Sequence, residues 1–225
     1  MIIKETEYTM KNGRQVLIRS PREEDIQGIL DYLYQTACET EFLLRYPEEC
    51  SQYTPESEKV FLERINASET EAFLTALADG KVVGTAQIRW STNLKLKHRA
   101  SVGIALVKDY WNQGIGTVMM QEMIRIAEAN PDILQVELDF IEGNTRARAL
   151  YEKMGFRITG VRPNAIRLKD GTLLNEYSMI REIRKPRPTG QGGNEPRGAG
   201  QGDGSFVLFM NQQKEGNHHA ERPTR

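Results

Sequence analysis

The sequence has few of the residues that build metal centres and covalent cross-links. It contains two cysteines, Cys38 and Cys50, and three histidines. Two cysteines cannot form the disulfide framework of a small secreted domain, so we expect a reduced, cytoplasmic setting. Three histidines leave little room for a His-rich metal site or for a Ser-His-Asp triad, so we expect no metal cofactor.

Long apolar runs and an excess of one charge are also missing. The longest apolar stretches have about five residues, whereas a membrane-spanning helix needs roughly 20. Residues 1–5 lack the apolar region of a signal peptide. The 30 Lys and Arg residues balance the 31 Asp and Glu residues, which leaves a net charge of −1. This balance argues against a nucleic-acid binder and against a membrane-surface protein.

The 225 residues, 39% hydrophobic and 27% charged, are typical of one globular domain with its own core. Composition changes near position 184, because residues 185–225 hold 8 of the 19 glycines and 4 of the 9 prolines. Such a segment buries too little apolar surface to offset its ordering entropy. We therefore expect a domain over residues 1–184 and a Gly/Pro-rich disordered tail over 185–225. Its apolar segment, 205–210, is either a docking motif or a chance cluster.

Strand and helix signals alternate along the domain. Hydrophobic periodicity predicts strands at residues 15–19, 72–78, 81–90, 99–107, 134–141, 157–168 and 172–181. Helices are predicted to begin at Pro21, Pro55, Ile115 and Thr145. Two Asp-Gly pairs, at 79–80 and 170–171, are typical of hairpin turns. The order predicts an α/β (α+β) fold with a mixed sheet and helices on both faces.

The first segment with chemical potential, residues 107–117, passes from a strand directly into a helix. No Ser, Thr or Asp cap precedes the helix, so its first N–H groups need another acceptor, and a pyrophosphate would supply one. Gly114 and Gly116 lack Cβ atoms, so a ligand can approach the backbone there, although a tight bend also explains them. The segment is neither a P-loop nor a dinucleotide fingerprint.

The second segment, residues 144–156, is a helix with two polar residues on one face. Asn144 and Tyr151 are seven residues apart, which is two turns, so both can contact the same ligand. Gly155 suits the left-handed residue that follows a helix. Asn144 could instead be only the helix cap, and Tyr151 only a half-buried core aromatic.

Together, strand, Gln-Gly-Ile-Gly, helix and strand, followed by Asn-x-x-Ala-x-x-Leu-Tyr-x-x-x-Gly-Phe, resemble the GNAT superfamily of acetyl-CoA-dependent N-acetyltransferases, including ribosomal-protein-alanine and small-amine acetyltransferases. The resemblance follows the element order of residues 15–182 and is specific over about 100–156. It implies a mixed, mostly antiparallel central sheet of six to seven strands with helices on both faces. It also implies acetyl transfer from acetyl-CoA to a primary amine by direct attack in a ternary complex, and it allows a homodimer.

The resemblance also implies roles for particular residues. The backbone that would wrap the pyrophosphate of coenzyme A belongs to Asn112, Gln113, Gly114, Ile115, Gly116 and Thr117. Trp111 stands where the family usually has Arg or Gln, which puts a side-chain contact in doubt but not the backbone contacts. The strand residues beside the pantetheine arm would be Ile104, Ala105 and Leu106. Asn144 matches a pantetheine-contacting asparagine, and Tyr151 matches the tyrosine that often protonates the departing thiolate.

Chemistry supports an acid and a base at these positions. A tyrosine with a pKa of about 10 can donate a proton to a thiolate when the corresponding thiol has a pKa of about 8.5. Glu137 and Asp139 alternate on a strand and share a face, so either could accept the proton of the amine. Asp139 matches a position where some family members keep a carboxylate base. Both could instead only solvate the surface or pair with Arg146 or Arg148.

The acceptor is less defined. Residues 36–53 fall where the family builds its acceptor side, and their interleaved acids and aromatics suit a cationic amine such as a polyamine, an aminoglycoside-like sugar or a protein N-terminus. A solvated charged surface explains the same residues, which are Glu39, Glu41, Phe42, Arg45, Tyr46, Glu48, Glu49 and Tyr53. Alternatives to an enzyme are a non-catalytic acyl-CoA-binding or sensor module and an interaction protein that acts through its tail.

Overall fold

The computed structural model describes residues 1–183, so the expected tail and its apolar segment lie outside the described residues. The strands are β1 (Thr6–Thr9), β2 (Gln15–Arg19), β3 (Glu71–Ala78), β4 (Lys81–Trp90), β5 (Arg99–Leu106), β6 (Gln135–Ile141), β7 (Arg157–Arg167) and β8 (Leu173–Glu182). The α-helices are α1 (Ile26–Glu39), α2 (Pro55–Ala67), α3 (Ile115–Ala129) and α4 (Thr145–Lys153), with 3-10 turns η1 (Glu23–Asp25), η2 (Pro47–Gln52) and η3 (Lys108–Tyr110). None of the helices within residues 1–183 is long and apolar enough to cross a bilayer.

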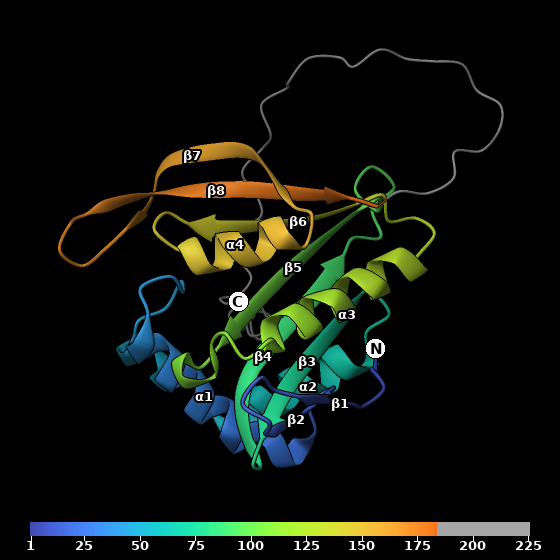
Figure 1. Ribbon diagram of the computed structural model, residues 1–225, viewed down its shortest axis with the longest axis vertical. Helices are drawn as coiled ribbons and strands as arrows, with labels where there is room; N and C mark the ends of the chain where they lie inside the picture. Colours follow the sequence, from blue (N-terminus) through green and yellow to red (C-terminus); the bar gives the residue numbers. More distant parts are fainter. Residues whose placement is uncertain (184–225) are drawn as a thin grey trace, which may run out of the picture.

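The strands form one eight-stranded sheet in the order β1-β2-β3-β4-β5-β6-β8-β7 (Figure 1). Neighbouring strands run antiparallel except β5 and β6. The mixed, mostly antiparallel sheet expected from the sequence is confirmed, with one strand more than expected. The extra strand is β1, which is four residues long and largely exposed, so it carries no hydrophobic alternation to reveal it.

The first helix begins later than Pro21 suggested. A 3-10 turn precedes α1, and its last residue, Asp25, is buried. The Asp25 carboxylate accepts hydrogen bonds from the Arg22 backbone N–H (2.7 Å) and from Arg19 Nη1 (2.6 Å). Pairing with a buried arginine on β2 holds this acid at the turn, so the regular helix starts at Ile26.

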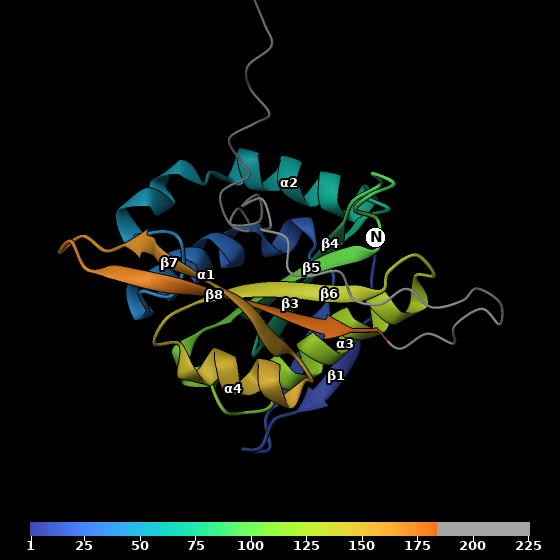
Figure 2. The ribbon, with the colours of Figure 1, turned by 90° about the horizontal axis from the view of Figure 1, so that it is seen from above.

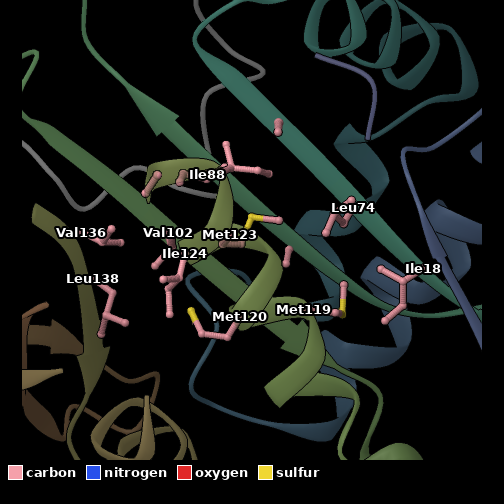
Figure 3. Packing of buried hydrophobic residues seen from close by; sticks show 14 of the residues in the cluster. Ile18, Leu74, Ile88, Val102, Met119, Met120, Met123, Ile124, Val136 and Leu138 are labelled. Carbon is pink, nitrogen blue, oxygen red and sulfur yellow. The ribbon is translucent and has the colours of Figure 1, made fainter. Parts of the chain in front are cut away.

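Helices cover both faces of the sheet, as expected (Figure 2). The helices α1 and α2 lie on one face, and α3 and α4 lie on the other. The buried side of α3 packs Met119, Met120, Met123 and Ile124 against apolar side chains of the central strands (Figure 3). Because side chains alternate along a strand, Ile104 and Leu106 of β5 face α3, whereas Ala105 between them packs with the α1 side.

The centre of the sheet is opened by the parallel pair. Pairing between β5 and β6 lasts for three positions, from Arg99–Gln135 to Ser101–Glu137. Beyond them β5 continues along β4, and β6 continues along β8, each in an antiparallel ladder. Figure 1 shows the two strands diverging from this point. Among the strands of residues 1–183, none pairs with the edge of residues 102–106 on the β6 side.

Candidate active site

An open cavity of about 1220 Å³ occupies this fork. Val136, Leu138 and Phe140 of β6 pack in the core shared with α3 and α4. Glu137 and Asp139, which alternate with them, therefore face the opposite side of the sheet. The cavity is lined both by these two carboxylates and by Tyr151 of α4. It therefore passes through the sheet and is reached by side chains from both faces.

Backbone donors gather where η3 leads into α3. Gly114 is the residue before the helix, and no side chain caps it. The N–H groups of Thr117 and Val118 donate to Gly114 O, whereas those of Ile115 and Gly116 have no acceptor among residues 1–183. These two free donors and the helix dipole make the start of α3 suited to an anion. The expected cradle residues thus form one continuous turn, in which Asn112 and Gly114 take positive φ angles.

The two glycines of this turn serve protein packing. A Cβ atom on Gly114 would collide with the Tyr8 hydroxyl, which donates to Gln113 O (3.2 Å). A Cβ on Gly116 would lie 3.3 Å from side-chain atoms of Leu106 and Leu150. The space left by the missing Cβ atoms is therefore filled by the protein itself, and only the N–H groups are left for a ligand.

We expect the Gly114→Ala variant to lose about 2–3 kcal/mol of unfolding free energy, because alanine must adopt φ +93° and displace Tyr8. Gly13→Ala is the matched control, since Gly13 has φ +83° with no atom within 4 Å of the added carbon. It isolates the backbone strain, about 1 kcal/mol. Urea unfolding measures both variants, and equal losses would show that the Tyr8 contact contributes nothing.

Helix α4 carries Asn144 and Tyr151 to the cavity wall. Asn144 is the N-cap, with Oδ1 accepting from the Ala147 N–H at 3.2 Å, so the capping interpretation is confirmed. Capping uses only the oxygen of the amide, and the NH₂ group keeps its donors. The two residues share one cavity, as their spacing predicts.

Tyr151 is buried between Phe140 and Phe156, with both ring centroids 6.2 Å from its own. The aromatic packing expected as an alternative is therefore present, but the residue also lines the cavity. Burial raises the pKa of Tyr151 to about 12. The phenol accordingly stays protonated at physiological pH and is available as a proton donor.

The two candidate bases differ in their surroundings. Asp139 Oδ1 accepts a hydrogen bond from Ser178 Oγ at 2.6 Å, and burial raises the pKa of Asp139. Glu137 is held by Arg99, whose Nε and Nη2 each approach one carboxylate oxygen to 2.6 Å. Both oxygens of Glu137 are thus occupied by a guanidinium, whereas no hydrogen bond within residues 1–183 engages Asp139 Oδ2. Neither pairs with Arg146 or Arg148.

The acidic segment before α2 is mostly used for structure. Of its charged and aromatic candidates, Phe42 alone lines the cavity. Glu39 accepts from the Lys108 N–H (2.7 Å), Glu49 accepts from the Tyr46 N–H (2.8 Å), and Glu48 pairs with Lys169. None of these three acids lines the cavity, which disfavours the interpretation of the segment as a pocket for a cationic amine and leaves that of a charged surface.

The sequence analysis did not identify several residues that line the cavity. They are Arg99, Arg162, Glu176 and Ser178, with Glu176 buried and bound to Arg162 Nη1 at 2.6 Å. A signal existed in β8, where polar Glu176 and Ser178 alternate with Tyr177 and Met179, which pack in the core. Their proximity to Asp139 depends on the pairing of β6 with β8.

Comparison with known proteins agrees with this geometry. The family model described as "Acetyltransferase (GNAT) family" matches residues 33–156. An N-alpha-acetyltransferase of Sulfurisphaera tokodaii is 30% identical over 155 residues, which cover 65% of this chain and 83% of that protein. A GNAT-family acetyltransferase of Streptococcus pneumoniae superposes with a TM-score of 0.70 at 27% identity, over 75% of this chain and 99% of that one.

A further solved structure shares the fold at lower identity. The phosphinothricin acetyltransferase of Sinorhizobium meliloti, in complex with acetyl-CoA, has a TM-score of 0.64 at 17% identity and covers 77% of this chain and 94% of its own. The family match extends over more than half of the sequence and includes the loop before α3 and all of α4. The chain therefore belongs to the GNAT acetyltransferase family, which confirms the acetyl-CoA-dependent acetyltransferase expected from the sequence.

Proposed function

We propose that the protein transfers an acetyl group from acetyl-CoA to a primary amine by direct attack in a ternary complex. The observation that carries this proposal is the cavity through the β5–β6 fork, with Asp139 on one face and Tyr151 on the other. A base and an acid on opposite faces of one cavity can serve the attacking amine and the departing thiol separately. Asp139 is proposed as the base because Glu137 is engaged by Arg99.

The residues on the α3 side fit acetyl-CoA. The free N–H groups of Ile115 and Gly116 suit its pyrophosphate. Beyond the fork, Ile104, Ala105 and Leu106 no longer pair with β6, so the pantetheine arm can lie beside this part of β5. All three residues line the cavity. Acetyl-CoA would supply the acetyl group and the thiol leaving group, whereas the proposed acid and base belong to the protein.

The proposed step balances with two proton transfers, one from the amine to the protein and one from the protein to the leaving sulfur. The nitrogen–carbon bond to the acetyl group forms, and the carbon–sulfur bond breaks. Asp139 accepts the proton that the amine loses, and the Tyr151 hydroxyl gives its proton to the sulfur. A net transfer of one proton from Asp139 to Tyr151 through water restores both residues.

A protein α-amine is the acceptor class that we propose first. The Sulfurisphaera tokodaii relative bears the name N-alpha-acetyltransferase and is covered over most of its length. The cavity is open, as a site that admits the end of a longer chain requires. The cytoplasmic location and the homodimer stay predictions.

Calorimetry with acetyl-CoA, followed by thiol release on the same sample, tests this function. We expect acetyl-CoA to bind and thiol to be released with peptides that have a free α-amine, but not with the same peptides blocked at the N-terminus. Release only with polyamines or aminoglycosides would move the acceptor to small molecules. Binding with no turnover over the whole panel would support the sensor module, and absence of binding would overturn the proposed function.

A further inference from the structure

Trp111 is fixed in the cavity wall next to the start of α3. Its indole Nε1 donates a hydrogen bond to Leu106 O at 2.8 Å, which sets the orientation of the ring. The guanidinium carbon of Arg146 lies 3.8 Å from the centre of that ring. Both residues line the cavity. The indole therefore serves as a platform that holds a cation at the loop leading into α3.

Arg146 occupies a position that is unfavourable for helix stability. It lies in the first turn of α4, where the helix dipole disfavours a positive charge. No carboxylate within residues 1–183 forms an ion pair with it, whereas Arg148, two residues later, pairs with Glu152 at 2.8 Å. The charge of Arg146 is thus left available to a ligand in the cavity.

A second cation of α4, Lys153, contacts the first turn of α3. Lys153 is seven residues after Arg146, so the two share one face of the helix. Lys153 Nζ lies 3.4 Å from Thr117 Oγ1, in the first turn of α3. Leu150, on the same face, packs beside Gly116. Helix α4 therefore brings one positive side chain to the loop before α3 and another to the first turn of α3.

We propose that Arg146, held on the Trp111 ring, binds a phosphate group of acetyl-CoA. This inference rests on the proposed function and assigns the positive charge at the loop to α4, since position 111 carries an uncharged ring. A stacked guanidinium keeps its edge donors exposed, and their planar arrangement matches phosphate oxygens. Lys153 adds to the positive potential of the site.

Calorimetric titration of acetyl-CoA into Arg146→Ala, Arg148→Ala and the wild-type protein tests this role. We expect Arg146→Ala to raise the Kd by about tenfold or more, as for loss of a charged hydrogen bond. Arg148→Ala, on the same helix and exposed, should keep the wild-type Kd within about twofold. In parallel, kcat/KM with S-acetylpantetheine, which lacks the phosphates, should be the same for Arg146→Ala and wild type.

The outcomes separate this inference from the proposed function. If the wild-type protein binds acetyl-CoA and Arg146→Ala binds it equally well, the assignment of Arg146 is wrong while the proposed function stands. If Arg148→Ala weakens acetyl-CoA binding as much as Arg146→Ala does, the effect comes from net charge alone, and the assignment of Arg146 is again wrong. A loss with S-acetylpantetheine as large as that with acetyl-CoA would indicate a structural role for Arg146. A wild-type protein that binds no acetyl-CoA would overturn both proposals.

A double-mutant cycle tests the platform. Trp111→Ala alone should weaken acetyl-CoA binding, because the guanidinium loses the surface that orients it. Adding Arg146→Ala to Trp111→Ala should then cost less than it does in the wild-type background. Additive losses would show that Trp111 does not act through Arg146.

Discussion

Tyr151→Phe is expected to lower kcat by about 100-fold or more while the Kd for acetyl-CoA stays within about twofold. Phenylalanine keeps the ring between Phe140 and Phe156 and removes only the hydroxyl that would protonate the leaving sulfur. Because burial raises the pKa of Tyr151 to about 12, its titration should add no loss of activity on the alkaline side of the ordinary assay range. Steady-state thiol release and calorimetry measure the two quantities.

Tyr177 on β8 provides the matched control. Its ring stacks on Phe140 with centroids 5.2 Å apart, but it is not among the residues that line the cavity. Tyr177→Phe should therefore keep nearly full activity. Wild-type turnover in Tyr151→Phe would leave Tyr151 as a core aromatic and remove its assignment as general acid.

Asp139→Asn is expected to lower kcat/KM by about 100-fold at neutral pH. A general base works only when deprotonated, so wild-type activity falls as the pH drops through the pKa of Asp139. Burial raises that pKa above its ordinary value of about 4, which places the acidic limb of the profile higher than for a solvated aspartate. In Asp139→Asn this limb should disappear. The pH dependence of kcat/KM, measured with an acceptor of known amine pKa, checks the prediction.

Two neighbouring variants sharpen this test. The hydrogen bond from Ser178 lowers the pKa of Asp139 against the effect of burial, so Ser178→Ala should move the acidic limb to higher pH. Glu137→Gln should keep the limb, because Arg99 occupies both oxygens of Glu137. A limb that is lost in Glu137→Gln and kept in Asp139→Asn would reverse the two assignments.

Local sequence patterns were sufficient for most elements and for part of the site. The seven-residue spacing of Asn144 and Tyr151 predicts that both reach one cavity, and the alternation of Glu137 with Asp139 predicts their common face. The uncapped start at Ile115 predicts free N–H groups. These features depend on backbone periodicity and on residues within two turns of one another, so they can be read directly from the sequence.

Composition misled where side chains have distant partners. The acids of residues 36–53 suggested a pocket for a cationic amine, but Glu48 binds Lys169 on the β7–β8 hairpin and Glu39 binds the backbone of Lys108. Likewise, Gly114 is required by Tyr8, about a hundred residues earlier in the chain. Such contacts follow from the order of strands in the sheet and leave no local pattern.

The sequence by itself therefore determined the family, most of the helices and strands, and the candidates for donating or accepting a proton. Only the tertiary structure decided that Asp139 is hydrogen-bonded by Ser178 through one oxygen while Arg99 engages both oxygens of Glu137, and that the cavity crosses the sheet at the β5–β6 fork. The physical reason is that β5 and β6 each form a longer antiparallel ladder with another strand, so their own pairing stops after three positions. The point at which two strands separate depends on how all the neighbouring strands of the sheet pair. That information is not present in any single segment of the sequence.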